Sequence, residues 1–195
     1  MKKKILYILI VIIMLLFGIC IIKICEEKRE QQEIVVDEIE HKIVFIFSDI
    51  SYSEGYNHRG YFIDNCGDRY YYNLSDYENL YSEDLYYEYL NEHIEEYEKE
   101  PYLEKEQLYE AYKHLLMIDA NAEIKEECTG STHAGSFCYF GIRPGKDGEM
   151  EIILLNEDGD WRTTNLDKNV DDIMEIIESD NWRRDIWEKS NHCTD

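Results

Sequence analysis

The chain has 195 residues, of which 20 are basic and 43 acidic, giving a formal net charge of −23. Residues 1–25 contain four lysines and no acid, so the remaining chain carries 16 basic and 43 acidic residues, a formal charge of −27. Such a surface repels nucleic-acid phosphates and anionic lipid headgroups, which excludes a nucleic-acid-binding role. Cationic partners are compatible with this charge, and the same charge also serves solubility.

An apolar segment from Ile5 to Cys25 follows three lysines at positions 2–4 and contains one charged residue, Lys23. As a helix, its twenty-one residues cover roughly the ~30 Å hydrocarbon core of a bilayer. A cleaved signal peptide and a lipoprotein signal both require small residues before the cleavage point. Isoleucine stands directly before Cys20, so we predict an uncleaved signal anchor, with lipidation of Cys20 as the alternative.

The charges that flank this segment predict its orientation. The short N-terminal tail, residues 1–4, is purely basic, whereas the basic residues after the segment are mixed with glutamates. The positive-inside rule therefore places residues 1–4 in the cytoplasm and the rest of the chain outside the cell membrane. We interpret residues 26–40 as a charged stalk and residues 41–195 as one acidic extracellular domain.

The first half of this domain alternates strand and helix signals. Residues 42–47 are β-branched and aromatic, which predicts a buried strand, and residues 60–63 and 69–74 flank a turn and predict a hairpin. Ser75 or Ser82 is expected to cap a helix that runs to about Lys99. A second helix is expected over residues 104–122, as an antiparallel neighbour of the first because the connection is short.

The second half predicts strands again. They are expected at residues 123–128, 136–143, 149–156 and 161–164. Asp167 is a candidate cap for a last long helix, and Trp182 and Trp187 fall in a further short helical stretch. The order ββ–αα–βββ–α predicts a single α+β domain, with an antiparallel sheet and segregated helices, preceded by one transmembrane helix.

Four cysteines fall in the predicted exterior domain, and an even number outside the cell is typical of disulfides. Four cysteines allow three connectivities. Cys128 and Cys138 enclose nine residues and resemble the arms of a hairpin, which favours this pair; Cys66 with Cys193 then follows by elimination.

No cofactor or metal is predicted, because the candidate sites have unsuitable spacing. Cys128, His133 and Cys138 have ligand types that suit zinc, but structural zinc pairs usually stand two to four residues apart. Ser131 and His133 are neighbours in a glycine-rich turn, without the elbow motif of a serine hydrolase. The acidic turn at residues 156–160 lacks the glycine and glutamate of a calcium loop.

Tyrosine is the compositional exception, with 17 residues, twelve of them between Tyr70 and Tyr112. Tyr70, Tyr71 and Tyr72 stand in one expected strand, whose side chains point alternately to the two faces of the sheet. All three therefore cannot point into one core, and this trio is the best candidate for a binding surface unless a helix covers it.

Several segments of the chain resemble small surface proteins of Gram-positive bacteria. These segments are the lysine-rich apolar leader, Gly60-Tyr61-Phe62-Ile63-Asp64 with Gly67 and Tyr70-Tyr71-Tyr72, and Gly159-Asp160-Trp161 followed by Asn165. These uncharacterised proteins are membrane-anchored or lipoprotein-like. The resemblance covers most of residues 42–178 and implies a cell-surface location. It implies no activity.

These patterns favour a non-enzymatic extracellular interaction module, monomeric in its exterior part, that binds a protein or a cell-surface polymer. A cell-wall or carbohydrate-binding domain that uses exposed tyrosines is the first alternative. A membrane-anchored hydrolase built around Cys66 or His133 is the second.

Overall fold

The computed structural model describes Phe17, Lys23, Ile39 and residues 41–52, 56–77, 80, 82–128, 135–145, 149–159 and 161–178. The chain divides into two compact units, residues 1–40 and residues 41–195, and the account below concerns the second. Apart from Phe17 and Lys23, the predicted membrane segment lies outside the described residues. Within the described part, no helix has the length and apolarity needed to cross a bilayer.

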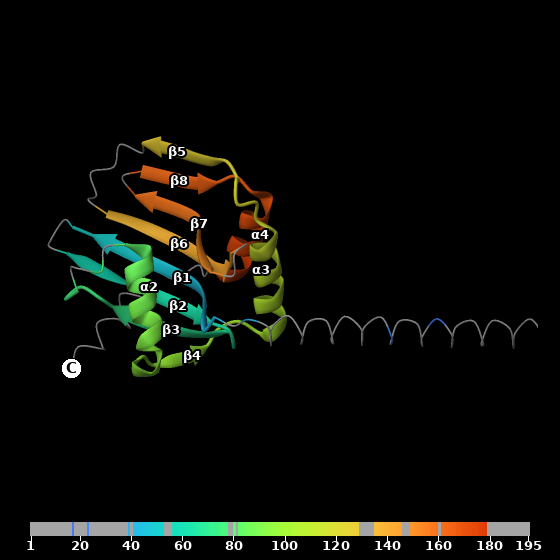
Figure 1. Ribbon diagram of the computed structural model, residues 1–195, viewed down its shortest axis with the longest axis horizontal. Helices are drawn as coiled ribbons and strands as arrows, with labels where there is room; N and C mark the ends of the chain where they lie inside the picture. Colours follow the sequence, from blue (N-terminus) through green and yellow to red (C-terminus); the bar gives the residue numbers. More distant parts are fainter. Residues whose placement is uncertain are drawn as a thin grey trace, which may run out of the picture. The chain divides into compact units, whose positions relative to one another are not determined.

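An eight-stranded antiparallel sheet forms the centre of the domain, as Figure 1 shows. Its spatial order is β4-β3-β2-β1-β6-β7-β8-β5. The strands are β1 (Ile43–Ser51), β2 (Asn57–Asp64), β3 (Asp68–Asn73), β4 (Lys99–Pro101), β5 (Ile124–Cys128), β6 (Gly135–Pro144), β7 (Met150–Gly159) and β8 (Trp161–Asn165). The predicted α+β class and antiparallel sheet are confirmed.

Both faces of the sheet are covered by helices of the described residues: α2 (Glu83–Glu92) on one face, α3 (Lys105–Met117) and α4 (Lys168–Ile177) on the other. Tyr86 and Leu90 of α2 join a core cluster with Phe62 of β2 and Phe140 of β6. On the opposite face, α3 packs so closely on β6 that a side chain at Gly141 would collide with Leu115.

The expectation of segregated helices, with the first two as antiparallel neighbours, is therefore wrong. The strand β4 explains the difference, because it lies between α2 and α3 in sequence and forms one edge of the sheet. The chain passes around this edge from one face to the other. The first helix is also shorter than predicted: it ends at Glu92 and is followed by a 3₁₀ turn, η1 (Ile94–Glu96).

Local interactions fix the turns that the sequence predicts. In the β2–β3 turn, Asp64 Oδ1 accepts hydrogen bonds from the backbone N–H of Cys66 and of Asp68, at 2.8 and 2.9 Å. Gly67 has a φ of +87°, a left-handed conformation that favours glycine. At the start of α4, Asp167 accepts from the backbone N–H of Asn169, which confirms the predicted cap.

Candidate interaction face

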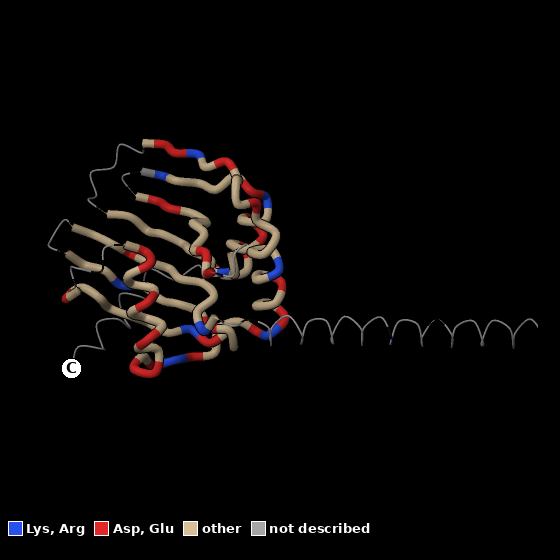
Figure 2. The backbone as a smooth tube through the Cα atoms, in the orientation of Figure 1, with Lys and Arg blue, Asp and Glu red and all other residues tan. Residues whose placement is uncertain are grey.

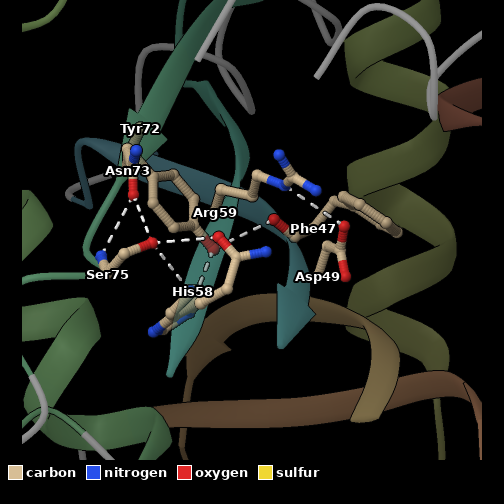
Figure 3. A network of polar contacts seen from close by, with 8 residues as sticks. Phe47, Asp49, His58, Arg59, Tyr72, Asn73 and Ser75 are labelled. Carbon is tan, nitrogen blue, oxygen red and sulfur yellow. Dashed lines mark hydrogen bonds and ion pairs between the residues drawn. The ribbon is translucent and has the colours of Figure 1, made fainter. Parts of the chain in front are cut away.

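A buried network of polar side chains joins β1, β2 and β3 beneath α2, and Figure 3 shows it. The Tyr72 hydroxyl lies 2.7 Å from Ser48 Oγ and donates to the carbonyl of Phe47 at 3.1 Å. His58 lies beside it, with its Nε2 3.5 Å from the Tyr72 hydroxyl and its Nδ1 3.1 Å from the Tyr56 hydroxyl.

The same network continues into the segment after β3. Ser75 Oγ donates toward Asn73 Oδ1 at 2.6 Å and accepts from the backbone N–H of His58 at 3.2 Å, as Figure 3 shows. At the other end, Arg59 pairs with Asp49 at 3.4 Å. These contacts tie adjacent strands together and set the path of the chain that leads to α2.

His58 is a structural residue. Its side chain is fully buried and packs edge-on against the rings of Tyr72 and Tyr86. Burial lowers the pKa of His58 to about 4, so the imidazole is neutral at physiological pH. A buried and neutral histidine of this kind holds a core together and is closed to substrate.

The cysteines of the described residues do not form a catalytic arrangement. Cys138 lies in the core, where burial raises the pKa of its thiol to about 12. Cys66 is exposed, but partial desolvation and the nearby carboxylates of Asp64 and Asp68 raise the pKa of its thiol. Both effects reduce the thiolate fraction, which is the nucleophilic form.

The predicted disulfide between Cys128 and Cys138 is absent from the structure, where both residues are free thiols. The physical reason is the strand order. Cys138 lies on β6 and Cys128 on β5, and strands β7 and β8 run between them. At about 4.8 Å per strand, this order separates the cysteines far beyond the reach of a disulfide. Cys66 is also free, and its predicted partner Cys193 lies outside the described residues.

The tyrosine trio is buried on both faces of the sheet. Tyr70 and Tyr72 point toward α2 and belong to the core cluster there, with 7% and 0% exposure. Tyr71 points to the other face, where its ring lies 5.0 Å from the guanidinium of Arg69 and its hydroxyl donates to Glu100. The predicted alternation is correct, but helices cover both faces, so the trio presents no exposed surface.

Other candidates lie elsewhere. Ser131, His133, Asp160 and Cys193 fall outside the described residues. Among the residues that the structure does describe, no three histidine, cysteine or carboxylate side chains come together in a way that suits a metal ion. A cleft of about 630 Å³ lies beside the C-terminal end of α3. Its arginine, Arg143, is already bound to Glu151 and to the carbonyls of Leu115 and Ile118.

The outer face of α2 carries a row of partly exposed apolar and aromatic side chains. Leu85, Tyr89 and His93 recur every four residues and therefore lie above one another on the helix. The ring of Tyr89 stacks on His93 at 4.2 Å and contacts Tyr77 at 4.9 Å. Leu85 and Tyr77 are each 40% exposed. We call Tyr77, Leu85, Tyr89 and His93 the aromatic row.

Acidic residues alternate with the aromatic row in the sequence, and Figure 2 marks Asp and Glu positions along α2 and the turn after it. Residues 83–98 contain seven acidic residues and no lysine or arginine, and all seven acids are exposed. None of the seven forms an ion pair with another residue of the described part of the chain. A hydrogen bond with Tyr77, partial burial and the charge of Glu96 raise the pKa of Tyr89 to about 12.

The predictions from the sequence did not include the aromatic row, although the sequence contains a usable signal for it. Tyr86, Leu90 and Ile94 repeat every four residues along the predicted helix, and all three are buried. The residues one position before them, Leu85, Tyr89 and His93, have the same four-residue period. A second apolar stripe on a helix that already has a buried stripe indicates a surface available for contact.

Comparison with known proteins adds no assignment. No family model matches this sequence, and no curated protein and no solved structure is significantly similar to it.

Proposed function

We propose that this protein is a membrane-anchored binding module, held at the outer face of the cell membrane by residues 5–25, which docks a protein partner on the outer face of α2. The aromatic row is the observation that supports this proposal. Tyr77, Tyr89 and His93 form a contiguous group of rings next to the exposed side chain of Leu85. Tyrosine is enriched in protein interfaces because its ring is large, rigid and both apolar and polar.

The structure of α2 makes this face well defined. The inner side of the helix is locked by Tyr86, Tyr87 and Leu90 in the core cluster. The rotation of the helix about its axis is therefore fixed. Within the aromatic row, Tyr77 and Leu85 are exposed, whereas Tyr89 is partly buried and packs against the core cluster. A surface that is already ordered loses little conformational entropy when a partner binds.

A protein partner fits the row better than a sugar does. The Tyr89 ring is stacked on His93 with an interplanar angle of 19°, and Tyr77 is tilted by 47° against Tyr89. One face of Tyr89 is thus occupied, and the rings do not form the flat platform on which a sugar ring stacks. A hydrolase finds less support, because the pKa values of Cys66 and Cys138 are both raised.

The membrane anchor is tested by labelling thiols in intact cells. Cys128 is exposed in the folded domain and serves as the reporter. After mild reduction, a maleimide that does not cross membranes should label the full chain in intact cells, and a Cys128→Ser variant should lose part of this labelling. Labelling that requires permeabilised cells would place the domain in the cytoplasm and overturn the proposal.

The docking face is tested by variants of the full chain in the membrane. Tyr89→Ser together with Leu85→Ser removes the centre of the aromatic row and keeps Tyr86, Tyr87 and Leu90, the buried residues of α2. Leu116→Ser is the matched control, because Leu116 is 46% exposed and belongs to α3, which covers the other face of the sheet. We expect a cell-surface partner that is crosslinked by the wild type and by the control, but not by the double variant. Equal crosslinking by all three would remove α2 from the proposal.

A further inference from the structure

The charges in the second half of α2 are unfavourable for the helix itself, whereas Glu83 and Asp84 in the first turn suit the helix dipole. Asp84, Glu88 and Glu92 repeat every four residues and form an acidic row beside the aromatic row. Like charges at this spacing repel one another and destabilise a helix. The last turn of α2 contains no basic residue, and Glu95 and Glu96 follow directly in η1.

The helix dipole adds to this effect. The C-terminal end of a helix carries a partial negative charge, which basic side chains normally offset and acidic ones oppose. Here Glu92 stands at that end, and the described part of the chain supplies it with no ion pair. Local arrangements that lower stability without a structural compensation are typical of surfaces used for function.

We infer that the partner that docks on the aromatic row is a lysine- or arginine-rich protein segment, an inference that rests on the proposed function. Basic groups would contact the acidic row and the C-terminal end of α2, where they find negative charge from both the side chains and the helix dipole. The partly exposed ring of Tyr89 offers a face for a cation–π contact or for the apolar stem of a lysine.

The geometry matches an extended segment of a few residues. The ten residues of α2 span about 15 Å, which an extended strand covers with roughly five residues. The acidic row and the aromatic row run side by side along that length, because Glu88 lies three positions after Leu85 and Glu92 three positions after Tyr89. A segment that alternates basic and apolar side chains contacts both rows at once.

The test uses the full chain in nanodiscs of uncharged lipid, so that the bilayer does not attract the probe. The probe is a fluorescent peptide of about ten residues that alternates lysine and leucine, and a peptide with glutamate in place of lysine is its counterpart. We expect the lysine peptide to bind, its affinity to fall as salt is raised, and the glutamate peptide to stay free. No measurable binding of the lysine peptide would overturn the inference.

Two pairs of substitutions separate this site from the general negative charge of the protein. Glu88→Gln with Glu92→Gln should weaken lysine-peptide binding by about fivefold, the effect of two exposed charge pairs. The same variant should melt at a higher temperature, because repulsion along the helix is reduced. Glu123→Gln with Glu126→Gln removes the same charge at the β5 edge and should leave the affinity within about twofold. Equal losses in both variants would mean that binding is unspecific and would refute the site.

The outcomes also separate this inference from the proposed function. If the aromatic-row variant loses its cell-surface partner but the lysine peptide does not bind wild type, the docking face stands and the basic partner is wrong. If the aromatic-row variant keeps its partner, the docking face itself is wrong, whatever the peptide does.

Discussion

The buried state of His58 makes a quantitative prediction about pH. Its pKa falls from the usual 6.5 to about 4 in the folded protein. At a pH between these values the unfolded chain binds a proton that the folded chain does not, so stability decreases as the pH falls. The full difference corresponds to about 3 kcal/mol, because one pKa unit equals about 1.4 kcal/mol. From about pH 7.5 to about pH 5 the expected loss is about 2 kcal/mol.

The variant that isolates this contribution is His58→Phe. Phenylalanine keeps a flat ring between Tyr72 and Tyr86 but cannot take up a proton. Urea unfolding of the full chain in nonionic detergent would be measured for both proteins across this pH range. Contributions from carboxylates are common to both and cancel in the difference. We expect the wild type to lose about 2 kcal/mol relative to His58→Phe between about pH 7.5 and about pH 5.

His41→Gln is the control, because it removes a histidine outside the buried network, and this variant should keep the wild-type dependence on pH. A wild type whose pH dependence is the same as that of His58→Phe would show that His58 protonates without penalty. The burial of the ring beneath α2 would then be incorrect, together with the packing of Tyr86 against it.

Two further predictions concern the core. Replacing Arg143 by leucine removes the donor to two carbonyls at the C-terminal end of α3 and leaves Glu151 without its partner. The free energy of unfolding, measured with urea, should fall by about 2–4 kcal/mol. A loss below about 0.5 kcal/mol would contradict the assigned contacts. A thiol reagent should label Cys128 in the native protein, whereas Cys138 should react only after unfolding. Mass spectrometry of digested samples distinguishes the two cysteines. Equal labelling of both in the native protein would contradict the burial of Cys138.

The sequence predicted the elements better than their arrangement. Strand periodicity and turn residues located the hairpin of β2 and β3, and Asp167 marked the start of α4. These signals are local, since each depends on residues within one turn or one strand. Glu92 could not be recognised as the end of the first helix, because Ile94 continues the four-residue pattern of Tyr86 and Leu90 into η1.

The order of the strands in the sheet could not be predicted from such local signals. The pairing of Cys128 with Cys138 assumed that β5 and β6 are neighbours because they follow one another in sequence. In the structure β5 pairs with β8 at the far edge of the sheet, and β6 pairs with β1 and β7. The burial of Tyr71 depends on the same long-range information, since it requires a helical layer on each face. Neither fact leaves a local pattern in the sequence.

The aromatic row and the buried network are linked through α2. Tyr86 points inward from the helix, and its ring lies 4.9 Å from that of His58. This contact helps to fix which side of α2 faces outward, so a substitution at His58 acts on a surface that it does not touch. His58→Ala removes the ring and should weaken binding at the aromatic row, whereas His58→Phe should preserve it. Hydrogen exchange of the α2 amides measures the cause directly, because a loosened helix exchanges faster. Unchanged exchange in His58→Ala would mean that Leu90 and Tyr87 alone hold the helix in place.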